Sequence, residues 1–236
     1  MIVSNPTPCE ILTEMAHTFA EKVPANYTMA AAFEIATGEV DPFHWHIRSI
    51  DGEVEWAPGS MEDPDTTFTL SSATLLKIHD GTWNGMTAAG RAHVRDPAPL
   101  NFTLPRDVHP LEAMRRGYFF LTHFFSVDNP TRVNFGPQHT RKIHGAGATA
   151  LFYHQGMRSA YYCITADDVL NEDGARDPMH QAFIVIGGEG TAIIGETETE
   201  VSMGQALYVP PDTVHMLRTG GPDPLEIIWL AWGEGA

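Results

Sequence analysis

Cysteine is scarce in this chain. Its 236 residues include only two, Cys9 and Cys163, and two cysteines cannot build the disulfide framework that holds small secreted proteins together. The first residues also lack a basic segment followed by an apolar one, so no secretory leader is expected. Together these absences predict a protein of a reducing compartment, the cytoplasm.

Positive charge is also scarce. Lysine and arginine together number 14 against 30 acidic residues, which gives a formal net charge of −16. Nucleic acid and anionic membrane surfaces are therefore excluded as partners on electrostatic grounds. No apolar run approaches the roughly 20 residues that a membrane-spanning helix needs. Hydrophobic residues nevertheless make up 43% of the chain, so a well-filled core is expected rather than disorder.

The first half of the chain mixes helical and strand patterns. Residues 10–22 carry apolar side chains at helical spacing, whereas residues 28–37, 43–47 and 66–70 alternate apolar and polar residues as half-buried strands do. The other segments expected are a strand around 54–56, a helix over 73–78 capped by Ser71, a short segment 86–89, a strand over 91–94 and a helix over 111–125. Pro97, Pro99 and Pro105 mark loose chain or an edge strand.

The order of these segments resembles one known family. Asp65 to Gly81 reads as a strand, a helix and a terminating glycine, and Met86 to Val94 as a small-residue segment followed by a strand. On these residues, positions 8–126 are similar to the sterol carrier protein 2 family of lipid-binding domains. The resemblance implies an α+β domain, in which helices lie over a five-stranded mixed sheet and an apolar tunnel holds a lipid or acyl chain. The residues expected to line that tunnel are Phe33, Phe68, Leu75 and Met86.

The second half has a different sequence pattern, with turn residues followed by short strands. Residues 127–147 are rich in turn signals such as Asn129-Pro130 and Gly145-Ala-Gly147, and we interpret them as a linker. Residues 148–236 consist of many short strand patterns, which favours a small β-barrel or sandwich. The expected strands are 149–154, 159–165, 181–186, 190–194, 197–201, 206–209, 214–218 and 226–232.

One run in this half resembles the second signature motif of the cupin β-barrels. Gly204, Pro210 and His215 match that motif, while Asp212 replaces its second glycine and Thr219 its asparagine. The resemblance implies an all-β cupin barrel (a double-stranded β-helix, or jelly roll) over residues 148–236. It also implies that the imidazole of His215, a metal ligand in that family, points into the barrel.

The first cupin motif is present only in outline. Gln181 stands where the family has a glutamate, and Ala175 and Asp177 (or Gly174 and Arg176) stand where it has two histidines. A neutral amide is a poor ligand for a transition metal, and His180 is sent to the opposite face of the strand from Gln181 unless a bulge intervenes. We therefore expect no cofactor; the alternative is a divalent transition metal on His215, His180 and Asp177, with His154 as a further ligand.

Two functions remain open from the sequence. The first is binding of a hydrophobic small molecule or lipid, with His154, Phe183 and Tyr208 lining the barrel pocket around His215. The second is an enzyme in which His215 is the general acid or base, Gln181 orients the substrate and Asp177 orients the imidazole or shares the proton transfer. Without a metal such an enzyme would be an isomerase, lyase or cyclase; with one, a dioxygenase. A homodimer is expected because cupins often pair their barrels and because a single barrel exposes a sheet edge.

Overall fold

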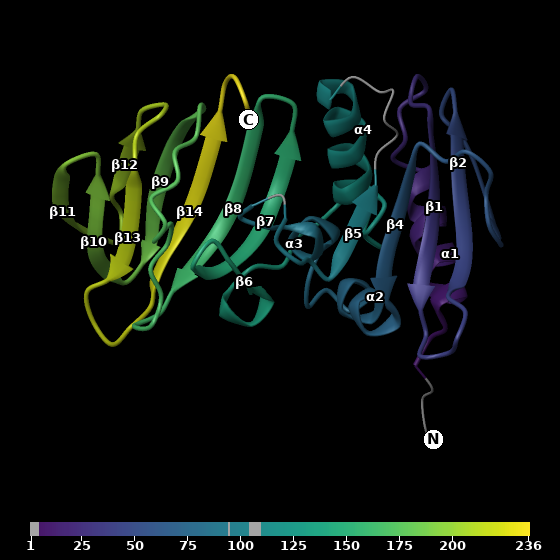
Figure 1. Ribbon diagram of the computed structural model, residues 1–236, viewed down its shortest axis with the longest axis horizontal. Coiled ribbons are helices and arrows are strands. Elements are labelled where there is room, and N and C mark those ends of the chain that lie inside the picture. Colours follow the sequence, from purple (N-terminus) through teal and green to yellow (C-terminus); the bar gives the residue numbers. More distant parts are fainter. Residues whose placement is uncertain (1–4, 94, 104–109) are drawn as a thin grey trace. The chain divides into compact units, whose positions relative to one another are not determined.

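The chain forms two compact units. The computed structural model describes residues 5–93, 95–103 and 110–236. One unit consists of Met1–Ala89 and Pro97–Val133, and the other of Gly90–Asp96 and Asn134–Ala236 (Figure 1). The short segment Gly90–Asp96, expected within the first domain, thus belongs to the second unit.

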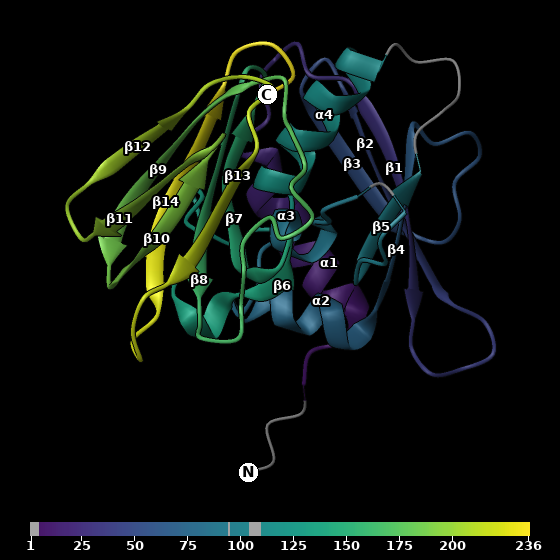
Figure 2. The same ribbon diagram turned by 60° about the vertical axis from the view of Figure 1, so that its left-hand side comes forward.

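The first unit contains one mixed sheet of five strands, as expected. The strand order is β3-β2-β1-β4-β5, with β1 parallel to β4 and the other neighbours antiparallel. Figure 2 shows the helices together on one face of this sheet. The strands are β1 (Met29–Ala36), β2 (Phe43–Ile50), β3 (Glu53–Pro58), β4 (Thr66–Ser71) and β5 (Leu100–Thr103).

The helices begin where the sequence provides caps. Helix α1 (Pro8–Ala20) follows Thr7, whose backbone N–H donates to Glu10 Oε2 at 2.7 Å while its own hydroxyl accepts from the Glu10 N–H at 3.3 Å. This reciprocal capping box satisfies two backbone donors that a helix start leaves free. Helix α2 (Ser72–His79) has the expected Ser71 cap, and the other helices are α3 (Gly85–Ala89) and α4 (Pro110–His123).

The fifth strand lies elsewhere than predicted. Residues 91–93 form no strand, and Val94 lies outside the described residues. The fifth strand is β5 instead, which pairs antiparallel with β4 along Thr67–Leu70. It lies at the sheet edge and follows Pro97 and Pro99. An edge strand has one unpaired side, so prolines beside it remove no ladder hydrogen bond.

The residues expected to line a lipid tunnel are packed into a core of aromatic rings. Phe33 and Phe68 are fully buried, with ring centroids 5.3 Å apart, and Leu75 and Met86 are also buried. Rings from the end of α4 and the residues after it fill the space above the sheet. They are Phe120, Phe124 and Phe125, all within 6.1 Å of the Phe33 ring centroid.

The second unit consists of two antiparallel sheets that share one core (Figure 2). The six-stranded sheet has the order β12-β9-β14-β8-β7-β6, and the three-stranded sheet the order β11-β10-β13. All eight segments expected as strands are strands, and the interval 127–147 contains a ninth, β6. They are β6 (Arg141–Ile143), β7 (Ala146–His154), β8 (Met157–Ile164), β9 (His180–Gly187), β10 (Glu189–Ile194), β11 (Thr197–Ser202), β12 (Ala206–Val209), β13 (His215–Thr219) and β14 (Leu225–Trp232).

Gly188, between β9 and β10, turns a corner rather than closing a hairpin. We expected Gly188-Glu-Gly190 to be a hairpin turn, but β9 and β10 belong to different sheets. Gly188 has φ +73°, and a Cβ there would lie 2.2 Å from the carbonyl oxygen of Pro224. Only glycine fits this left-handed, tightly packed position, which lets the chain cross from one sheet to the other.

The cysteines and the lengths of the helices were also considered in the sequence. Both cysteines carry free thiols, Cys163 buried and Cys9 half-buried. Among the described residues, no helix has the length and apolar character needed to cross a membrane.

Candidate functional site

The inner face of β9 provides the base of the site. Gln181, Phe183 and Val185 are buried, while His180 and the other alternate residues are more exposed. Across the sheet, Gln181 lies opposite Ala231 and Phe183 opposite Trp229, which are buried residues of β14. The period of two along a strand therefore sends this set into the core.

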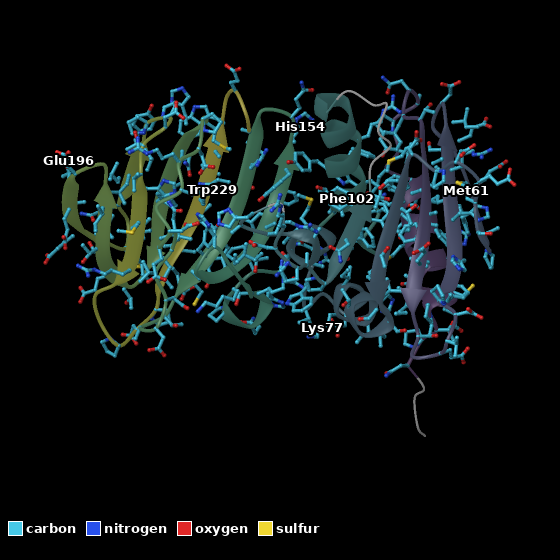
Figure 3. All side chains as sticks on the ribbon, viewed as in Figure 1. Met61, Lys77, Phe102, His154, Glu196 and Trp229 are labelled. Carbon is cyan, nitrogen blue, oxygen red and sulfur yellow. The ribbon has the colours of Figure 1, made fainter. Side chains whose placement is uncertain are left out.

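The amide of Gln181 is held between two partners. Trp229, labelled in Figure 3, donates its indole Nε1–H to Gln181 Oε1 at 2.7 Å, and Gln181 Nε2 donates to Asp177 Oδ2 at 3.1 Å. An indole N–H can only donate, so the carbonyl oxygen of the amide must face Trp229. The amide nitrogen therefore faces Asp177, and the sequence-predicted pair Gln181 and Asp177 is brought into direct contact.

His215 begins β13 and points into the same core. The residue is only 3% exposed, and its ring centroid lies 5.4 Å from that of Phe183. Its Nδ1 lies 3.3 Å from the carbonyl oxygen of Thr213. Burial lowers the pKa of His215, against the opposing effects of Thr213 and Asp177, so the imidazole is neutral at pH 7. Among the described residues, Nε2 has no hydrogen-bond partner.

Asn171 ties the start of β13 to the loop before β9. This fully buried residue donates from Nδ2 to the carbonyl oxygens of His215, at 2.7 Å, and Ala175, at 2.9 Å. Its Oδ1 accepts from the Ala175 N–H at 3.0 Å. Sequence reasoning missed Asn171, because a lone asparagine in a polar loop gives no sign of being buried.

Two more residues of this region were missed. Burial raises the pKa of Tyr162 on β8, and the nearby charge of Asp177 raises it further. Burial lowers the pKa of His144, although the charges of Asp173 and Asp177 act in the opposite direction. Strand alternation in 157–164 could have placed Tyr162 on the inner face. There, the centroid of its ring lies 6.4 Å from that of Trp229. His144 was missed because residues 127–147 were interpreted as a linker.

Three expected site residues lie outside this core. His180 is on the outer face of β9, as alternation predicts, where its Nδ1 lies 2.7 Å from the hydroxyl of Tyr208 and its ring stacks on Trp232 at 5.8 Å. Tyr208 is 52% exposed. His154, labelled in Figure 3, ends β7 and is exposed. None of the three joins His215, Gln181 and Asp177.

Two sheets that close over a buried histidine define this unit as a small β-barrel. Residues 172–231 match the family model described as "Cupin domain", so this segment, rather than the whole chain, is cupin-like. No curated protein matches the chain significantly. The matches give no support to the sterol carrier resemblance or to a homodimer, and both remain predictions.

Solved structures resemble the chain only over part of its length. A Cupin 2 conserved barrel domain protein from Salinispora arenicola CNS-205 is 12% identical, with a TM-score of 0.39, over 44% of this chain and 90% of its own. A cupin 2 conserved barrel domain protein from Rhodopseudomonas palustris is 19% identical, with a TM-score of 0.36, over 43% of this chain and 79% of its own.

The residues of the site do not fit the metal that cupins often bind. The carbonyl oxygen of Gln181 is a weak ligand for a transition metal and already accepts the indole N–H of Trp229. His180 lies on the other face of its strand. In the part of the chain that the structure describes, no three His, Cys, Asp or Glu side chains are grouped so that they could hold a metal ion. The alternative set of His215, His180 and Asp177 is therefore not assembled.

Acidification below pH 6.5 is expected to destabilise the second unit. Burial lowers the pKa values of His144 and His215 in the folded chain, whereas an unfolded histidine has a pKa near 6.5. The unfolded state then binds more protons, so stability is complete above about pH 6.5 and is lost as pH falls toward the folded pKa values. Urea unfolding at pH 7.5 and pH 5.0 should show a smaller free energy at pH 5.0.

The matched variant for this pH effect is His215→Phe, which removes one of the two groups. The decrease in unfolding free energy between pH 7.5 and 5.0 should be smaller in the variant than in the parent. An equal or larger decrease would contradict the assignment of His215 as a buried neutral imidazole.

Proposed function

We propose that the barrel of the second unit binds a small, largely apolar molecule whose polar group contacts His215, without the metal usual in cupins. The observation that carries this proposal is the imidazole of His215. The residue is 3% exposed, and its Nε2 has no hydrogen-bond partner among the described residues. Nε2 is not one of the described buried atoms that lack a partner, so it keeps some access to solvent, and a polar group of a bound molecule would supply its partner.

The side chains of the core that His215 shares with Gln181 support a ligand of mixed character. Apolar surface comes from Phe183 and Trp229, which are both buried. Polar groups come from Asp177 and from the hydroxyl of Tyr162, a residue with no hydrogen-bond partner among those described. Mostly apolar walls with a few convergent polar groups are typical of small-molecule sites.

A second candidate function is catalysis, favoured by the state of His215. A neutral imidazole with an unpaired nitrogen can remove a proton from a bound molecule near pH 7. Asp177, close enough to influence the pKa of His215, would stabilise the imidazolium that forms. Proton transfer of this kind suits an isomerase, a lyase or a cyclase. A dioxygenase would need the metal for which the ligand set is not assembled.

The binding proposal is tested with 2-phenylethanol, which joins one apolar ring to one hydroxyl group. We expect the full chain to bind it in calorimetry, and His215→Phe and Tyr162→Phe to weaken binding about three- to tenfold each, which is the effect of one lost hydrogen bond. The control is His154→Phe, at an exposed position, which should leave binding unchanged. Binding that neither inner variant weakens would contradict a site at His215.

A further inference from the structure

We propose that two copies of this chain pair through the outer face of the six-stranded sheet. The outer face is the set of side chains that β12, β9, β14 and the start of β8 turn away from the barrel core. They are Tyr208, His180, Ile184, Ile186, Leu230, Trp232 and Met157. The homodimer expected from the sequence rested on a family resemblance and on an exposed sheet edge, whereas here the contact lies on a sheet face.

Strand β14 is apolar on both of its faces. Ile227 and Trp229 point inward and belong to the barrel core. Leu230 and Trp232 point outward and are apolar as well. An antiparallel strand with one face in water alternates apolar and polar residues, whereas a continuous apolar run is typical of a strand covered on both faces. The outward residues of β14 therefore indicate a face that another surface covers.

Strand β11 of the other sheet shows the opposite pattern. It runs from Thr197 to Ser202, and all of its residues except Val201 are exposed. Every one of those exposed residues is a threonine, a serine or a glutamate. The second unit thus places polar residues where a strand meets water, and the apolar residues of the outer face depart from that rule.

The described chain covers the outward side of this sheet at one end. The ring centroid of Phe135 lies 5.4 Å from that of Tyr161 on β8, and Tyr161 is fully buried. Toward β12 the outward side chains are open to solvent: Tyr208 is 52% exposed, Trp232 40% and Ile186 39%. Large apolar side chains that gather in the open on one face mark an interaction site.

Three rings of the outer face contact one another. The ring centroid of His180 lies 5.9 Å from that of Tyr208 and 5.8 Å from that of Trp232, and the last two lie 6.3 Å apart. His180 Nδ1 and the Tyr208 hydroxyl are hydrogen-bonded at 2.7 Å, which holds both side chains in place. Tyrosine and tryptophan side chains carry much of the binding energy of protein interfaces, because they offer large contact area at a low entropic cost. The three rings are thus preorganised to anchor a partner.

The charge of the chain favours a second copy as that partner. At a net charge of −16, two copies repel each other unless they meet through a surface without acidic side chains. The described residues of the outer face include no Asp, Glu, Lys or Arg. A basic protein therefore finds no carboxylate to pair with, and nucleic acid or an anionic membrane finds no cation. An uncharged apolar face fits another of its own kind, which two-fold symmetry supplies.

The area of the outer face is sufficient for a weak dimer. Strands lie about 4.8 Å apart and rise about 3.3 Å per residue. Four strands, of which β9 and β14 have eight residues each, therefore present roughly 500 Å² per copy. Two copies cover roughly 1,000 Å², the lower limit for a specific interface, so we expect a dissociation constant of about 10–100 μM.

Sedimentation equilibrium of the full chain between 5 and 500 μM at pH 7.5 tests the pairing, and the mass should rise from that of one chain to that of two. Trp232→Glu and Ile186→Glu each place a carboxylate where two copies meet, and each should weaken pairing by at least about thirtyfold. The matched control is Val40→Glu, which adds the same charge at a 99% exposed position of the other unit. It should leave the dissociation constant within about twofold of the parent.

A second measurement needs no variant. Hydroxyl-radical footprinting at 5 and 500 μM should show oxidation of Trp232 and Tyr208 at least about twofold slower at the higher concentration, because pairing covers both rings. Oxidation of Val40 should not change.

Three results would overturn the pairing. A parent with the mass of one chain at 500 μM would assign the outer face to a different partner. A dimer that neither glutamate variant weakens, or that Val40→Glu weakens equally, would place the contact elsewhere. Unchanged oxidation of both rings in a dimer would do the same. None of these results bears on the ligand of the barrel, because His215 lies on the inner side of β9, next to Phe183.

Discussion

Replacing Asn171 by alanine is expected to lower the free energy of unfolding of the second unit by about 3–5 kcal/mol. The variant loses three side-chain hydrogen bonds, two to the Ala175 backbone and one to the carbonyl oxygen of His215. Those backbone groups are left without their partner in a place where Asn171 is fully buried, and each unsatisfied buried group costs about 1–3 kcal/mol. Urea unfolding followed by circular dichroism measures the effect.

The backbone of Asn171 allows the hydrogen bonds to be separated from strain. Its φ is +59°, which alanine adopts at a penalty of roughly 1–2 kcal/mol and glycine adopts freely. Asn171→Gly should therefore be less destabilising than Asn171→Ala by about 1 kcal/mol, while still losing the side-chain bonds. Asn134→Ala, at an exposed position of the same unit, should stay within about 0.5 kcal/mol of the parent. Equal stability of Asn171→Ala and Asn134→Ala would contradict the role of Asn171.

Replacing Phe124 by alanine should destabilise the first unit by about 3–5 kcal/mol. The side chain is fully buried, and its ring centroid lies 4.5 Å from that of Phe120, 5.1 Å from that of Phe33 and 5.2 Å from that of Phe125. Removing the ring leaves a cavity in a region where neighbouring rings touch from several sides. Thermal and urea unfolding, with hydrogen exchange to locate the loss in the first unit, would measure it.

The Phe124 variant also tests the lipid tunnel expected from the sterol carrier resemblance. Val40→Ala is the control, because Val40 is 99% exposed and its truncation should change stability by less than about 0.5 kcal/mol. If Phe124→Ala were as stable as Val40→Ala, the ring would occupy open space, as a tunnel lining does. A large loss instead supports a packed aromatic core at Phe33 and Phe68.

Local patterns were enough to predict most of the elements. The strands around Gln181 and His215 followed from alternation and from the glycine and proline positions of the cupin-like run, because turn residues and a period of two act over a few neighbouring residues. The same patterns placed Ser71 as a helix cap. They failed for β5, since an edge strand and loose chain both tolerate proline, and for Gly188, since a corner and a hairpin both need glycine.

Some residues of the candidate site were likewise predicted from the sequence, and others were not. His215, Gln181 and Asp177 were selected by their positions in the two cupin-like motifs, and the exclusion of His180 from the inner face followed from alternation. His144 and Asn171 were missed because nothing within a few residues of them distinguishes a buried polar side chain from an exposed one. Tyr162 was missed although the alternation along 157–164 places it on the inner face of its strand.

The sequence by itself determined that an α+β half precedes a small β-barrel, because short-range periodicity and turn residues act over a few neighbouring positions. That His215 points into the barrel was implied by the resemblance of its surroundings to a cupin motif. Only the tertiary structure decided which way the polar groups around the histidine face. Trp229 lies 48 residues from Gln181 along the chain, and cross-strand packing alone brings its N–H to the glutamine carbonyl. That contact fixes the orientation of the amide, so that the amide nitrogen donates to Asp177.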